Sequence, residues 1–223
     1  MDADQLQDAV RQVFTAAGGD RMGWPDPHPG HTVADEEYSR VSDPDKFRII
    51  TVRAAAWITA LVEGGLATAT PLTDADDVRG AWSGEPPHLG ASVEATWLHP
   101  VAGGAVPLLL CLDRVQEAEH AYLVVGIGEP AVQVDTLPDC GCDACDSGST
   151  DLLQALDRRL IDVVSGELTY IRLPDGVVCG GGDGWSAGWT SGAGRDREQV
   201  EALIVEARAG RSSYQVVHGR PWW

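Results

Sequence analysis

The sequence predicts an α+β protein in which an antiparallel sheet of about five to six strands forms a meander, with helices on one face and a helical region at the N-terminus. Apolar residues recur at helical spacing in the first part of the chain, and short β-type segments follow one another from about residue 90. Runs of strands and helices, in place of strict alternation, are typical of antiparallel sheets. We expect a single domain over residues 1–223, with an N-terminal helical region at 1–66 and an α+β core at 90–223.

Four helices are predicted from apolar periodicity and from the residues at their ends. Pro44 suits the first turn of the second helix, and Asp196 can form a capping box with Gln199 at the start of the fourth. A glycine follows the last periodic residue of each helix, as is common at helix ends. The helices are expected to cover residues 2–17, Ser42 or Asp43 to Gly64, Ser149 or Thr150 to Gly166, and Asp196 to Gly210.

The strands are predicted from short segments rich in aliphatic and β-branched residues. Pro174-Asp175-Gly176 has the composition of a turn, which indicates a hairpin around it. The proline-rich segment 20–41 and the glycine-rich segment 180–194 are expected to be loops. The predicted strands cover residues 92–98, 106–112, 121–127 and 131–137 in the meander, 168–173 and 177–179 in the hairpin, and 214–218 at the end.

The charge of the chain limits its partners. Lys and Arg number 16 against 34 Asp and Glu, a formal net charge of −18 that is spread over all 223 residues. Nucleic-acid binding draws most of its affinity from neutralising phosphates, so nucleic acid and anionic membranes are not expected as partners. A basic protein fits the charge, because long-range attraction raises association rates. The simplest alternative is that the charge only keeps the protein soluble.

A cytoplasmic location is expected. No segment reaches the roughly 18 consecutive apolar residues of a membrane span. The first residues, Met1-Asp2-Ala3-Asp4-Gln5, are acidic where a signal peptide is basic. Thiols stay reduced in the cytoplasm, so closely spaced cysteines are expected to bind metal more readily than to form disulfides.

Three of the five cysteines, Cys140, Cys142 and Cys145, form a C-x-C-x-x-C pattern interleaved with aspartates. The aspartates are expected to raise the pKa of these thiols, and a bound cation would reverse that effect. Three interpretations stay open: a zinc site, reduced cysteines that fill a tight loop, and a redox or disulfide pair. Zinc is favoured because one short loop supplies three soft ligands, whereas the negative surroundings oppose a reactive thiolate.

A closed zinc site needs a fourth ligand, and the meander ranks the candidates. The strand at 131–137 runs into the cysteine segment, so Cys111 and His120 fall at the same end of the sheet. Cys179 is expected to lie farther away. For Cys111 the alternative is a buried apolar residue within a strand. His28 and His31 form a weaker H-x-x-H candidate in a proline-rich loop.

The segment from Pro138 to Ser149, which reads PDCGCDACDSGS, resembles a family of uncharacterised acidic proteins from high-GC bacteria. The resemblance is strongest over residues 138–157 and extends over the whole chain. It implies that the cysteine segment is a family hallmark without implying a reaction.

No catalytic motif stands out in the sequence, and no histidine is followed by the glutamate of an H-E-x-x-H pair. The favoured hypothesis is a non-catalytic protein with a cysteine-rich loop that binds zinc or acts structurally. Two alternatives remain: a metal-dependent hydrolase with an open zinc site, and an immunity-type protein that binds a basic partner. A fourth protein ligand favours the closed site, whereas a cleft with a nearby carboxylate favours the open one.

Overall fold

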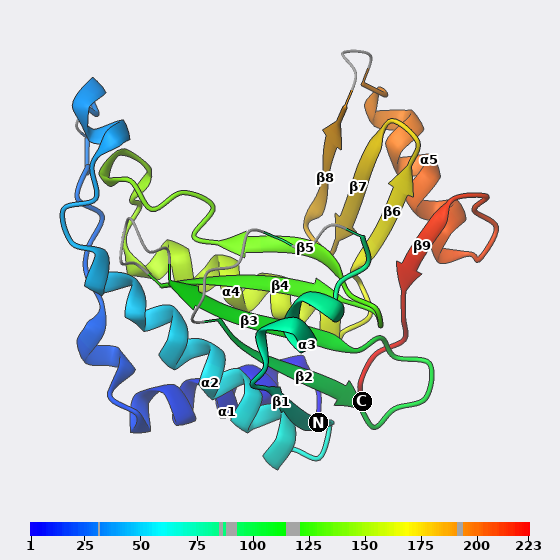
Figure 1. The fold of residues 1–223 in the computed structure, drawn as a ribbon, viewed down its shortest axis with the longest axis horizontal. Coiled ribbons are helices and arrows are strands. Elements are labelled where there is room, and N and C mark those ends of the chain that lie inside the picture. The colour runs from blue at the N-terminus through cyan, green and yellow to red at the C-terminus, as the bar shows by residue number, and fades with distance from the viewer. Residues whose placement is uncertain (31, 85–86, 88–92, 115–120, 191–193) are drawn as a thin grey trace.

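The structure is a computed structural model that describes residues 1–30, 32–84, 87, 93–114, 121–190 and 194–223. Two antiparallel sheets and five α-helices make up this part of the chain (Figure 1). The α+β class and the antiparallel meander are therefore confirmed.

The larger sheet is a meander of five strands in the order β1-β2-β3-β4-β5. Each strand pairs antiparallel with the next along the chain, and α3 lies in the connection between β1 and β2. The strands are β1 (Ala67–Leu72), β2 (Glu94–Pro100), β3 (Leu108–Arg114), β4 (Ala121–Ile127) and β5 (Val132–Leu137).

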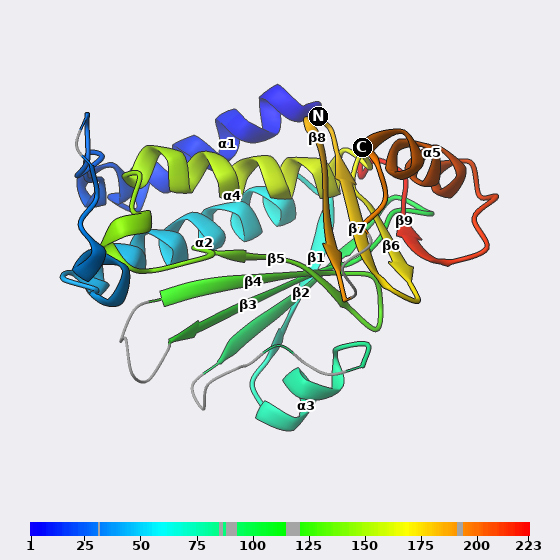
Figure 2. The same ribbon diagram turned by 90° about the horizontal axis from the view of Figure 1, so that it is seen from above.

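Helices cover this sheet unequally. Figure 2 shows α1 (Ala3–Ala16), α2 (Arg48–Glu63) and α4 (Ser149–Val164) on one face and the short α3 (Ala75–Gly80) on the other. Side chains alternate across a strand, so Leu108 and Leu110 of β3 pack into the core beneath the three long helices. Leu109 of the same strand packs into a separate cluster with Val78 of α3.

A buried polar network fixes α4 against α2. Arg53 binds Asp157 through two hydrogen bonds, of 2.8 Å from Nε and 2.5 Å from Nη2. The indole of Trp57 donates to the same carboxylate at 2.7 Å. Because Arg53 and Trp57 lie one turn apart on α2, both reach a single residue of α4. The carboxylate of Asp157 compensates the charge of the buried guanidinium and accepts its hydrogen bonds.

The second sheet has the order β8-β7-β6-β9 and carries α5 (Arg197–Arg208). Val200 and Ile204 of α5 pack with Ile171 and Val178 in a small core of their own. Both Figure 1 and Figure 2 place this sheet at the end of the molecule opposite the connection between β5 and α4. Its strands are β6 (Thr169–Leu173), β7 (Gly176–Gly181), β8 (Gly184–Trp189) and β9 (Gln215–His218).

The predicted hairpin, the last strand and the capping box of Asp196 are all confirmed. The start of the second helix differs, because Pro44 opens a 3₁₀ turn and α2 begins at Arg48. Further 3₁₀ turns lie in the predicted loops and beside the cysteines. The 3₁₀ turns are η1 (Gly19–Met22), η2 (Asp35–Ser39), η3 (Pro44–Phe47) and η4 (Asp143–Cys145).

Three elements were not predicted: β1, α3 and β8. β1 is an edge strand with Pro71 in it, and most of its side chains are exposed, so it lacks a hydrophobic pattern. The glycine-rich segment is mostly strand. In β8, Trp185, Ala187 and Trp189 pack against the core beside α5, and the residues between them are small.

In the part of the chain that the structure describes, every helix is too short or too polar to span a lipid bilayer.

Candidate metal site

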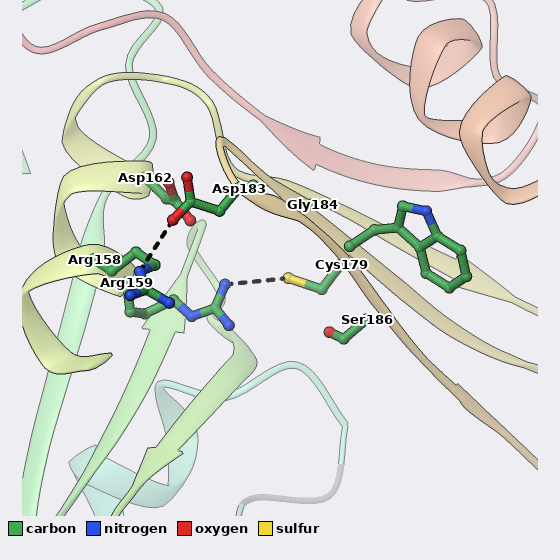
Figure 3. A pocket seen from close by; sticks show the side chains of 9 residues that line it. Arg158, Arg159, Asp162, Cys179, Asp183, Gly184 and Ser186 are labelled. Carbon is green, nitrogen blue, oxygen red and sulfur yellow. Dashed lines mark hydrogen bonds and ion pairs between the residues drawn. The ribbon is translucent and has the colours of Figure 1, made fainter. Parts of the chain in front are cut away.

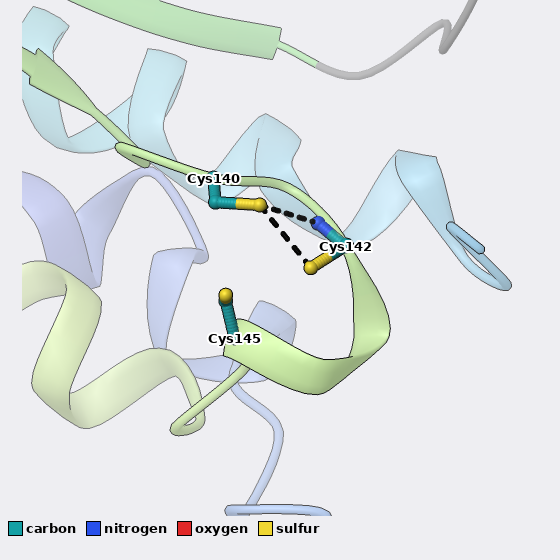
Figure 4. A group of neighbouring side chains, drawn as sticks. All are labelled: Cys140, Cys142 and Cys145. Carbon is teal, nitrogen blue, oxygen red and sulfur yellow. Dashed lines mark hydrogen bonds between the residues drawn. The ribbon is translucent and has the colours of Figure 1, made fainter. Parts of the chain in front are cut away.

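The three clustered cysteines converge in the connection between β5 and α4. The sulfur atoms of Cys140, Cys142 and Cys145 all lie within 4.8 Å of one another. Figure 4 shows them pointing toward a common centre, with the thiol of Cys140 3.2 Å from the sulfur of Cys142. Among the described residues, these three alone form a group that could hold a metal ion.

The spacing of the sulfurs is close to what one tetrahedral ion needs. A Zn–S bond of about 2.3 Å places two thiolates of a tetrahedron about 3.8 Å apart. The observed sulfurs lie within 4.8 Å of each other, so small side-chain rotations would bring all three to bonding distance. The backbone already gathers the ligands, because the short turn η4 brings Cys145 back toward Cys142.

Asp143, between two of the cysteines, holds the loop against the N-terminal segment. Its carboxylate accepts hydrogen bonds from the backbone N–H of Ser42 at 2.9 Å, from the Ser42 hydroxyl at 2.6 Å and from Nε of Arg40 at 2.7 Å. Its own N–H donates to the carbonyl of Arg40 at 2.8 Å. Burial raises the pKa of Asp143, but the bonds from Arg40 and Ser42 outweigh it and hold this pKa well below its usual range.

Asp146, just after the last cysteine, is held in the same way. Its carboxylate accepts from Nζ of Lys46 at 2.6 Å, from the indole of Trp24 at 2.9 Å and from the N–H of Gly148 at 2.8 Å. The side chains of Lys46 and Asp146 are only 11% and 5% exposed, so this ion pair is buried. Burial raises the pKa of Asp146, and the bonds from Lys46 and Trp24 lower it by more.

These ion pairs correct the expected electrostatics of the loop. The aspartates were expected to keep the cysteines protonated, but the charges of Asp143 and Asp146 are compensated by Arg40 and Lys46. Burial raises the pKa of the Cys142 thiol, yet hydrogen bonds from the neighbouring thiols and from backbone N–H groups bring it below its ordinary value. Those same bonds to Cys142 and Cys140 raise the pKa of Cys145 to about 12. The hydrogen bonds among the sulfurs therefore shift the pKa values of Cys142 and Cys145 in opposite directions.

Two of the three thiols face a cavity. Cys140 and Cys145 are exposed and line a space of about 340 Å³, whereas Cys142 is buried and is not part of its lining. The first turns of α4 form one wall through Leu152 and Ala155. The remaining lining residues are Phe47, Leu137, Pro138, Asp139, Asp146, Ser147, Gly148 and Asp151.

The structure does not bring Cys111 into the triad, because successive side chains of β3 point to opposite faces of the sheet. Cys111 lies near the expected end of the sheet, since it pairs with Val124 while the adjacent Leu123 pairs with Leu137 at the start of the loop. However, it is fully buried on the face covered by α3, whereas Leu137 packs into the core beneath the long helices. Burial and then the charge of Asp113 raise the pKa of Cys111 to about 12. The other candidate ligand, His120, lies outside the described residues, as does His31.

Cys179 lies in a different place, on β7 of the second sheet. It borders a cavity of about 220 Å³ with Arg158, Arg159 and Asp162 of α4. Figure 3 shows the guanidinium of Arg159 beside its sulfur, at 3.9 Å. Burial raises the pKa of this thiol, and the nearby Arg159 only partly offsets the effect.

Several residues at the site were not identified from the sequence. Arg40, Ser42 and Lys46 anchor the loop from 100 or more residues away along the chain. His28, considered only as a ligand, contacts the carbonyl of Asp143 through Nε2 at 2.9 Å. No local sequence pattern indicated these contacts, because each joins residues about 100 positions apart along the chain.

Comparison with known proteins adds a family but no activity. Neither a curated protein nor a solved structure matches the chain. A family described as "Family of unknown function (DUF6226)" matches residues 10–223, which include the anchoring segment, the cysteine triad and both sheets, and the chain belongs to this family.

Proposed function

We propose that the protein binds one Zn²⁺ ion through Cys140, Cys142 and Cys145, and that this ion stabilises the connection between β5 and α4. The observation that carries the proposal is the convergence of three sulfurs within 4.8 Å in a loop of six residues. Thiolates are soft ligands that select zinc among the common divalent ions of cells. A single tetrahedral ion fits this spacing.

The anchoring of the loop supports a structural role for the ion. Asp143 and Asp146 already attach the loop to the N-terminal segment, so the ligands are largely positioned before metal binds. Ligands that converge only in the folded chain make metal binding part of the folding free energy. The ion would then hold the start of α4, and with it the Arg53–Asp157 contact, in place.

Elemental analysis tests the proposal. Protein purified under reducing conditions without added metal is expected to carry about one equivalent of zinc. Cys142→Ser should lose that zinc, whereas Cys111→Ala, which changes a cysteine on the other face of the sheet, should keep it. Substoichiometric metal, together with free titration of Cys140 and Cys145 in the native state, would overturn the proposal and leave only packing of reduced cysteines.

A second candidate function is metal-dependent hydrolysis, and the cavity favours it. Three protein ligands leave a fourth position for water, and zinc held by three cysteines can activate water when a carboxylate is close. Asp139 and Asp151 line the same cavity as Cys140 and Cys145. Asp139→Asn should abolish zinc-dependent hydrolysis of a test ester while leaving the zinc content unchanged. Absence of any zinc-dependent turnover in the unchanged protein would reject this candidate.

A further inference from the structure

We propose that the cavity beside the triad binds a small molecule with an apolar body and a neutral nitrogen donor, and that this donor takes the fourth coordination position of the metal. The inference rests on the proposed metal site and adds the chemical class of its ligand. It follows from the ligand count, the exposure of the thiols, and the lining and charge of the cavity.

The ligand count leaves one position open. Tetrahedral zinc takes four ligands, and within the described part of the chain the group contains three. The two aspartates that follow Cys142 and Cys145 are already engaged, since Asp143 accepts three hydrogen bonds from Arg40 and Ser42. Asp146 accepts from a lysine, an indole and a backbone N–H. Moving either carboxylate onto the metal would leave a cation without its partner.

The cavity is the side from which a fourth ligand can approach. Cys142 is 8% exposed and faces the interior, whereas Cys140 and Cys145 are exposed and line the cavity. A metal bound to all three sulfurs is therefore shielded on the side of Cys142. Its remaining position is reached past the other two cysteines.

The lining of the cavity suits an apolar body. Phe47, Leu137, Pro138, Leu152 and Ala155 supply its hydrophobic surface. Its volume of about 340 Å³ falls in the range of small-molecule sites, which are mostly apolar with a few fixed polar groups. An aromatic ring or a short aliphatic chain would fit there.

The charge of the site favours a neutral atom as the fourth ligand of the metal. Zinc with three thiolates has a net charge of about −1, and Asp139 and Asp151 add negative charge at the same cavity. No described Lys or Arg lines it. A carboxylate or a further thiolate would add to the negative charge of the site, whereas a neutral imidazole or amine adds none, and imidazole nitrogen is a good zinc ligand.

Cobalt substitution makes the coordination visible. The Co²⁺ protein should show visible absorption bands typical of tetrahedral thiolate coordination, and 4-phenylimidazole should shift them. Because the phenyl ring is buried in the cavity, 4-phenylimidazole should bind roughly tenfold or more tightly than imidazole itself. Benzoate, which has the same ring and a negative donor, should leave the spectrum unchanged.

A matched pair of variants on α4 locates the ligand. Ala155→Phe fills the cavity and should remove the advantage of 4-phenylimidazole over imidazole while the cobalt spectrum stays intact. Gln154→Phe adds the same ring one residue earlier, where the side chain lines a different cavity with Gln7 and Arg11, and should leave the advantage unchanged.

The outcomes separate the two proposals. If no thiolate–cobalt bands develop, the metal site itself is wrong. If the bands develop but neither imidazole shifts them, if the two bind equally, or if Gln154→Phe abolishes the preference as fully as Ala155→Phe, the cavity is not the ligand site.

Discussion

Four of the five cysteines lie in two contrasting environments, the triad beside α4 and Cys111 on the opposite face of the larger sheet. On the face of the long helices, Cys140 and Cys145 are exposed, and the pKa of Cys142 lies below its ordinary value despite burial. On the other face, Cys111 is fully buried and its pKa is raised to about 12, by burial and then by Asp113. Two sulfurs of the triad border a cavity from which a metal can approach, whereas the Cys111 side chain has no exposed surface.

The difference shows that proximity to acidic residues along the chain does not decide the state of a thiol. The triad stands among aspartates in sequence, yet Arg40 and Lys46 neutralise two of them in space. Cys111 stands in an apolar run, and the nearby charge of Asp113 adds to the effect of burial. Solvent access and hydrogen-bond donors therefore separate a ligand from a packing residue.

The largest expected effect is on the triad itself. Cys142→Ser should lower the free energy of unfolding by several kcal/mol, on the order of a structural zinc contribution, because metal binding is coupled to folding. Chemical denaturation with and without a chelator measures this effect. A chelator should destabilise the unchanged protein by a similar amount and leave Cys142→Ser almost unaffected, whereas equal sensitivity of both proteins would contradict the account.

The next largest effect on stability is expected at the buried ion pair between Lys46 and Asp146. Lys46→Met leaves Asp146 without its cation and should cost about 3 kcal/mol, as expected when one partner of a buried pair is removed. Arg158→Met is a suitable control, since Arg158 and Asp183 form an exposed pair, 58% and 76% accessible, whose loss should cost less than about 1 kcal/mol. Equal losses of stability in the two variants would show that the loop is not held by this contact.

A smaller effect should follow from pH. The pKa values of Asp143 and Asp146 are lowered in the folded protein, so both carboxylates bind protons more weakly there than in the unfolded chain. Their stabilisation is complete above the unfolded value of about 3.9 and is lost as the pH falls below it. The melting temperature of the metal-free protein should therefore decrease as the pH is lowered below about 4, and this decrease should be less steep in Asp143→Asn. Parallel pH profiles for the two proteins would argue against this contribution.

The smallest effect belongs to Cys111. Cys111→Ala removes one buried sulfur from the cluster under α3 and should cost about 1 to 2 kcal/mol through the cavity it leaves. Native-state titration with a thiol reagent should leave Cys111 unmodified, while Cys140 and Cys145 react once metal is removed. Rapid modification of Cys111 in the folded protein would show that this thiol is accessible and would contradict the difference between the two environments.

Much of the fold was predictable because its signals are local. Local patterns within a few residues predicted four of the five meander strands, both ends of three of the four predicted helices, and the turn at Pro174-Asp175-Gly176. The cysteine triad was equally visible, since a single short loop supplies its ligands.

Contacts between distant segments were not predictable. The pairing of Lys46 with Asp146 joins residues 100 apart and has no periodic pattern. The face of Cys111 was undetermined because β3 is apolar on both sides, so alternation could not tell which face carries the long helices.

X-ray absorption at the zinc edge counts the atoms bound to the metal and identifies them by their distances. For a three-cysteine site we expect three sulfur atoms at about 2.3 Å and one nitrogen or oxygen at about 2.0 to 2.2 Å. We also expect that Cys140→Ser replaces one of the sulfurs with a lighter atom. A first shell without sulfur, or one of four sulfurs, would contradict a three-cysteine site with an open fourth position.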